Sequence, residues 1–151
     1  MAIAASSARG TDTRAAGTNR EAARRTPAAL ALLGALLAAA LGWLASDLFP
    51  PRPMEAELAL LLRGMAAIKT LLVVGLVAAI AWRSRWPMSP TLIAGYLAGA
   101  WSMAFATAMI WQLSAIAAAA VFFHVAEFAV LLMAWRDGLD RLLPPGKSRG
   151  H

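Results

Sequence analysis

The stretch TLIAGYLAGAWSMAFATAMIWQLSAIAAAAVFFHVAEFAVLLMAW, residues 91–135, is apolar for far longer than one membrane crossing. A transmembrane helix needs about 20 residues to cross a hydrocarbon core of about 30 Å. The stretch therefore predicts two helices, and the polar side chains of WQLS, residues 111–114, mark the turn between them. Ser114 is predicted to cap the second helix of this pair.

Two further apolar segments precede this stretch. Residues 28–46 contain no charged side chain, and residues 58–82 are interrupted only by Arg63 and Lys69. These Ala- and Leu-rich segments lack the alternation of a membrane β-barrel, so they predict helices. The expected fold is an all-α bundle of four transmembrane helices, at about 28–46, 58–82, 90–111 and 114–136.

The overall composition supports a membrane protein. The chain has 151 residues, of which 60% are hydrophobic, and its mean hydropathy is +0.63. The absence of cysteine excludes disulfides and thiolate metal sites. The net charge of +6 does not indicate nucleic-acid binding, because the basic residues flank apolar segments instead of following one polar face.

The placement of Lys and Arg predicts how the chain is threaded through the bilayer. Most of these residues lie before the first segment, in the loop after the second, or after the fourth. With four crossings, all of these regions lie on one side, which the positive-inside rule identifies as cytoplasmic. The sequence thus predicts a multi-pass protein of the bacterial inner membrane with both termini in the cytoplasm.

Both ends of the chain are predicted to lie outside the bundle. Residues 1–27 are interpreted as a disordered basic tail that is attracted to anionic lipid headgroups, and residues 137–151 as a short cytoplasmic tail. An organellar transit peptide has a similar composition to the first of these. Cleavage after the small residues 38–40 is another alternative, although the long preceding region argues against a signal peptide.

Small residues at four-residue spacing predict close helix packing, because lipid gives helices no hydrophobic reason to associate. Gly34, Ala38 and Gly42 share one face of the first segment, and Gly95 and Gly99 form a G-x-x-x-G pattern in the third. We expect these faces to hold the bundle together. Use of one face for a dimer or a larger partner is the alternative.

His124 and Glu127 are the only acidic or basic side chains between Met88 and Arg136. They are three residues apart and share a helix face. The helical rise of 1.5 Å per residue brings both to nearly the same depth as Lys69, about 14–18 Å below the outer surface. The sequence predicts a buried polar cluster of these three residues, with Lys69 paired to Glu127 and His124 beside them.

Two interpretations of this cluster remain open. It is either a structural clasp that fixes helix register or a working site, such as a proton relay or part of a substrate site. Arg63 is expected to extend its charge to the outer surface, and the mid-membrane Trp101 needs a partner for its indole N–H.

We predict no cofactor, and the metal content is left open. Haem with His124 and Met103 as axial ligands and a copper site with His124 and methionines are minor alternatives. The sequence contains no phosphate-binding loop or nucleophile elbow. The expected function is a non-enzymatic accessory or interaction subunit, in contact with the lipid bilayer and with a membrane-protein partner or further copies of itself. A proton-coupled transporter or a haem or quinone redox protein is the alternative.

Overall fold

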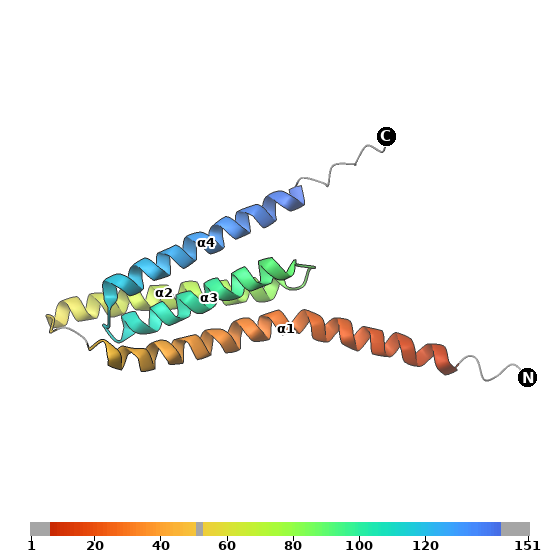
Figure 1. The fold of residues 1–151 in the computed structure, drawn as a ribbon, viewed down its shortest axis with the longest axis horizontal. Helices are drawn as coiled ribbons and strands as arrows, with labels where there is room; N and C mark the ends of the chain where they lie inside the picture. Colours follow the sequence, from red (N-terminus) through yellow and green to blue (C-terminus); the bar gives the residue numbers. More distant parts are fainter. Residues whose placement is uncertain (1–6, 51–52, 143–151) are drawn as a thin grey trace, which may run out of the picture.

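The computed structural model describes residues 7–50 and 53–142, with side chains described over 26–50 and 53–138. Successive helices run in opposite directions, so that α1 begins and α4 ends at the same end of the bundle (Figure 1). The described elements are α1 (Ser7–Ala45), the 3-10 helix η1 (Ser46–Leu48), α2 (Ala56–Arg83), α3 (Pro90–Trp111) and α4 (Ile116–Leu142).

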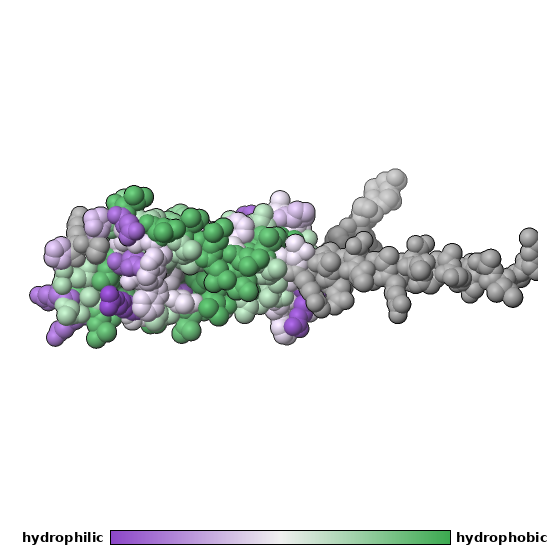
Figure 2. Space-filling model, turned by 90° about the horizontal axis from the view of Figure 1, so that it is seen from below, coloured by the Kyte–Doolittle hydropathy of each residue, from purple (hydrophilic) through white to green (hydrophobic). Residues whose placement is uncertain are grey.

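Four helices in the described part of the chain are long and apolar enough to cross a membrane. On the face that Figure 2 shows, hydrophobic residues cover the middle of the bundle, and hydrophilic residues gather mainly nearer its ends. The prediction of an all-helical chain with four long apolar helices is confirmed. The candidate spans are Thr26–Leu48, Ala56–Arg83, Pro90–Trp111 and Ile116–Gly138.

Helix α3 is the centre of the bundle and packs against each of the other three helices. Of its apolar segment 61% is buried, against 17–22% for the segments of the other helices. Small residues make this possible, because they allow the helix backbones to approach closely. The remaining helices surround α3 and turn most of their large apolar side chains outwards, as expected for a surface that faces lipid.

The glycines of the predicted packing faces all lie against neighbouring helices. A methyl group on Gly34 would overlap the indole of Trp101, and one on Gly42 would overlap the backbone of Phe105. Ala38, on the same face of α1, packs against the core. Gly95 and Gly99 lie against Met133 and Val130 of α4 in the same way. These faces are therefore used within the chain.

Helix α1 includes most of the region predicted as a basic tail, residues 1–27. It begins at Ser7 and runs continuously into the apolar segment, while residues 1–6 lie outside the described part. Alanine and arginine favour helix formation, and they are the most frequent residues of this region. Pro27 lies inside the helix, and α1 bends along its length (Figure 1). Helix α4 likewise continues into the predicted tail over 137–151 as far as Leu142, and 143–151 lie outside the description.

The turn between α3 and α4 marks one end of the bundle, here called the Ser114 end. Leu113 and Ala115 have left-handed backbones, with φ of 56° and 43°. Ser114 between them is fully buried, and its Oγ donates to the carbonyl of Phe49 at 2.6 Å. This role differs from the predicted cap of α4, because the tight turn directs Ser114 inwards, where its hydroxyl needs an acceptor.

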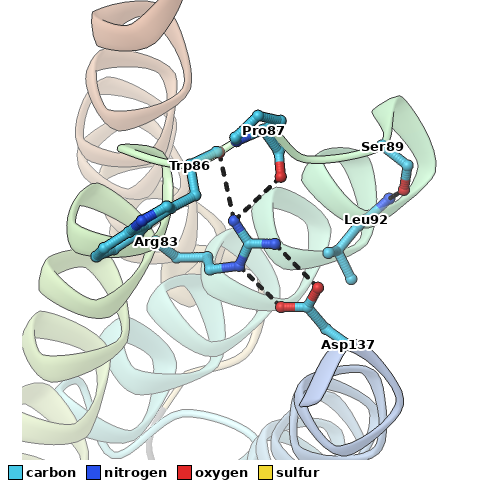
Figure 3. A network of polar contacts seen from close by, with 6 residues as sticks. All are labelled: Arg83, Trp86, Pro87, Ser89, Leu92 and Asp137. Atoms are coloured by element: carbon cyan, nitrogen blue, oxygen red, sulfur yellow. Dashed lines mark hydrogen bonds and ion pairs between the residues drawn. The ribbon is translucent and has the colours of Figure 1, made fainter. Parts of the chain in front are cut away.

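An ion pair joins α2 to α4 at the opposite end, here called the Arg83 end (Figure 3). Arg83 Nε and Nη2 donate to the two carboxylate oxygens of Asp137 at 2.8 and 2.9 Å. Its Nη1 lies 3.3 Å from the carbonyls of Trp86 and Pro87. Helix α3 begins beside this network, and Ser89 accepts from Leu92 N at 3.3 Å as its N-cap. One arginine thus connects two helices and the loop between α2 and α3.

Candidate functional site

Lys69 lies midway along α2, about 20 Å from either end by the helical rise. Its side chain is buried with 7% exposure, and it is the only ionisable member of the buried polar residues in the described part of the chain. Its Nζ lies 3.8 Å from the ring centroid of Phe123 on α4. The aromatic face provides a favourable contact for an ammonium group that has been removed from water.

His124 connects Lys69 to Glu127. Its Nε2 lies 3.3 Å from Lys69 Nζ, and its Nδ1 lies 2.9 Å from Glu127 Oε2. Lys69 and Glu127 form no direct ion pair among the described contacts, so the structure differs from the predicted pairing, although it brings the same side chains together. The reason is the spacing on α4, where positions three apart stack along one face and the imidazole lies between the two charges.

Two arrangements of protons satisfy these contacts, and the first keeps Lys69 and Glu127 charged. The Lys69 ammonium donates to His124 Nε2, which leaves the proton of the neutral ring on Nδ1, and this N–H donates to the Glu127 carboxylate. In the opposite arrangement, both protons have moved, so that Lys69 and Glu127 are neutral and the histidine has the other tautomer. Each arrangement gives every group in the chain of contacts a partner.

The cluster reaches the lateral surface of the bundle. The His124 side chain is 55% exposed and that of Glu127 is 29% exposed. The sequence instead predicts that both side chains are buried. The buried stripe of α4 is rotated away from them and consists of Ala119, Phe123, Ala126 and Val130.

The surface at this place is named the α2/α4 edge. It comprises Lys69, His124 and Glu127 with two flanking leucines, Leu72 of α2 and Leu131 of α4. These leucines follow Lys69 by three residues and Glu127 by four, and they are 46% and 56% exposed. The edge therefore combines a polar centre with an apolar border.

The other predicted site residues lie apart from the cluster. Arg63 is exposed on α2. Trp101 donates from Nε1 to the carbonyl of Leu30 on α1 at 3.3 Å, which supplies the partner that its indole requires. Met103 is buried in the core, and no contact joins it to His124 among the described side chains. The described residues contain no group of three or more His, Cys, Asp or Glu side chains suited to a metal.

Sequence reasoning missed several residues that the structure makes important. Asp137 is not among the predicted site residues, although an acid directly after an apolar segment, within a basic region, is a signal for a partner of Arg83. The sequence presents Phe123 only as one residue of an apolar segment. Its contact with Lys69 depends on the rotation of α4, which the sequence does not specify.

The arrangement can hold one charge separation, can exchange protons internally and can accept a further hydrogen bond at Glu127. The chain of contacts ends at Lys69, whose described contacts are His124 and the Phe123 ring. Comparison with models of known protein families, with curated proteins and with solved structures gives no match.

Proposed function

We propose that this chain is a multi-pass protein of the bacterial inner membrane that acts as a non-enzymatic interaction subunit. Its partner would bind at the α2/α4 edge. One observation carries the proposal: His124 and Glu127 lie within an apolar helix, far from both of its ends, and remain partly exposed on the lateral surface. Ionisable groups within a membrane span usually face the bundle interior or a cavity, so lateral exposure calls for a covering surface.

The energetics favour a covered cluster. A charged side chain at the centre of the bilayer costs about 2.5–3.5 kcal/mol on insertion scales. The contacts from Lys69 through His124 to Glu127 offset part of this cost, but they do not shield the exposed parts of His124 and Glu127 from lipid. A neighbouring protein surface would supply both shielding and further hydrogen bonds.

Proton-coupled transport is the second candidate, and the continuous contacts across three ionisable groups favour it. A transport path must continue on both sides of such a relay. Here Lys69 is the inner end and is packed over the Phe123 ring, and no onward acceptor for its ammonium is present among the described residues. Because the contacts end at Lys69, they favour a structural clasp between α2 and α4 with an exposed recognition surface over a proton-conducting path.

The charge distribution supports the proposed threading. Arg83 and Arg85 lie at the Arg83 end, together with Trp82 and Trp86, as expected for a cytoplasmic interface. Helix α1 starts and α4 finishes at this same end (Figure 1). The Ser114 end is richer in acids, namely Asp47, Glu55 and Glu57.

The proposal is tested with a photoactivatable amino acid in cells of the source organism. We expect the probe at Leu72 or Leu131 to form an adduct of one defined mass with a second protein. A matched probe at Leu37, which is 62% exposed on α1, should not form it. Glu127→Gln should reduce the adduct while the chain stays folded. Equal adducts from Leu37 and from the edge, or no adduct from the edge, would refute the proposal.

A further inference from the structure

Glu127 has an unused hydrogen-bonding capacity on the lateral surface. Its Oε2 receives the contact from His124, and its Oε1 has no protein donor among the described contacts. A carboxylate offers about four acceptor positions, and the side chain is 29% exposed. The α2/α4 edge therefore presents a free acceptor about midway across the membrane.

The cluster is also polarised from the inside to the outside. Its positive end is Lys69, which is 7% exposed, and its negative end is the more exposed Glu127. The surface of the edge is consequently negative, although the cluster as a whole is nearly neutral when His124 is uncharged. In a medium of low dielectric constant, such a group attracts a positive charge strongly.

We propose that the α2/α4 edge binds a transmembrane helix of another protein that carries a basic side chain level with Glu127. This inference rests on the proposed function and names the chemistry of the partner. A guanidinium or ammonium group would donate to the free acceptor positions of this carboxylate, at the exposed negative end of the cluster. Leu72 and Leu131 would provide the apolar border that excludes lipid from the new pair.

A second copy of this chain does not provide the required charge. Two copies with the same threading are related by an axis along the membrane normal, so identical residues meet at the same depth. Glu127 would then face Glu127, and like charges oppose association. Lys69 is buried and already contacts His124. Arg63 lies about 9 Å nearer to the Ser114 end than Lys69 does, by the helical rise.

The experiment measures binding of designed peptides to the full chain in phosphatidylcholine vesicles. Each probe is a leucine-rich transmembrane peptide with arginine, leucine or glutamate at its central position. Energy transfer is recorded from the labelled peptide to a dye on a cysteine introduced at Ala118, an exposed position of α4. We expect the arginine peptide to bind about tenfold more tightly than the leucine peptide. The glutamate peptide should bind no more tightly than the leucine peptide.

Two controls connect this preference to Glu127. Glu127→Gln should reduce it to less than about twofold, whereas the matched variant Glu57→Gln, at the exposed start of α2, should retain it. Moving the arginine by two helical turns within the peptide should also abolish the preference. This second control keeps Glu127 in the chain, so the test stands even where Glu127→Gln loses helicity.

The outcomes separate this inference from the function on which it rests. Equal binding of the arginine and leucine peptides, or a preference that survives Glu127→Gln, would overturn the inference that the partner carries a basic side chain. Adducts at Leu72 and Leu131 would then still support an interaction subunit of different chemistry. Self-association in vesicles that depends on Glu127 would instead identify a second copy as the occupant and overturn the inference.

Discussion

Arg83 binds both carboxylate oxygens of Asp137, at 2.8 and 2.9 Å, and thereby joins α2 to α4 across one end of the bundle (Figure 3). Both side chains are largely buried, with exposures of 15% and 14%. A lysine carries the same charge but cannot reproduce the paired geometry of a guanidinium. The stabilisation that this ion pair provides should therefore depend on whether the cation is arginine or lysine, and not only on its positive charge.

We expect Arg83→Lys to lower the free energy of unfolding in detergent micelles by about 1–2 kcal/mol. The matched control is Arg85→Lys, because Arg85 lies 5.1 Å from the Trp82 ring and is exposed. The control should change stability by less than about 0.5 kcal/mol. Equal effects of the two substitutions would show that the paired geometry contributes nothing beyond charge.

The Lys69 cluster should behave as a unit in stability measurements. Lys69→Met alone removes the donor to His124 Nε2 and leaves the carboxylate of Glu127 without its balancing charge. We therefore expect the free energy of unfolding to fall by about 1–3 kcal/mol. Lys69→Met combined with Glu127→Gln should recover much of this loss, because both charges are then removed. A double-mutant cycle in micelles measures the coupling. Additive effects would contradict the connected arrangement.

The histidine tautomer provides a direct spectroscopic test of the same contacts. With Lys69 protonated, His124 accepts at Nε2 and donates from Nδ1, so these contacts predict a ring with its proton on Nδ1. Nitrogen-15 chemical shifts of a histidine-labelled sample distinguish this form from the more common tautomer and from imidazolium. His151→Gln leaves His124 as the only histidine and simplifies the assignment. Lys69→Met should shift the ring to a different state, and an unchanged spectrum would contradict the contact.

Hydropathy and helix-end signals predicted much of the fold because they act locally. The length of the apolar stretch over 91–135 requires two helices, and the structure has α3 and α4 there. Residue spacing alone also predicts that Lys69 and His124 lie at nearly the same depth along the bundle. These properties depend on the rise of a helix and on its caps, and both can be read along the chain.

The rotation of each helix about its axis could not be predicted in the same way. Apolar residues surround α4 on all sides, so the sequence does not show that Phe123 faces inwards while His124 remains exposed. Which side chain stands between Lys69 and Glu127 depends on that rotation. The partner of Ser114 depends on a second connection far away in the sequence, the carbonyl of Phe49.

Glycine substitutions should distinguish packed from open helix faces. An added methyl group at Gly99 would overlap Val130, whereas one at Gly75 meets nothing within 4 Å. We expect Gly99→Ala to destabilise the chain by about 1–3 kcal/mol through overpacking. Gly75→Ala should be neutral or stabilising by up to about 1 kcal/mol, because alanine favours helix formation. Unfolding in micelles measures both, and a larger loss for Gly75→Ala would contradict the central position of α3 and indicate that the face of α2 with Gly75 is the packed one.

At the left-handed turn of the Ser114 end, a change from alanine to glycine should stabilise the chain. Ala115 has φ of 43°, a conformation that costs an L-residue about 1–2 kcal/mol and costs glycine little. Ala115→Gly should therefore raise the free energy of unfolding by about 1 kcal/mol. Ala118→Gly, three residues later inside α4, should lower it by about 0.5–1 kcal/mol, because glycine loses more backbone entropy in a helix. Destabilisation by both substitutions would show that the chain turns between α3 and α4 without a left-handed residue at position 115.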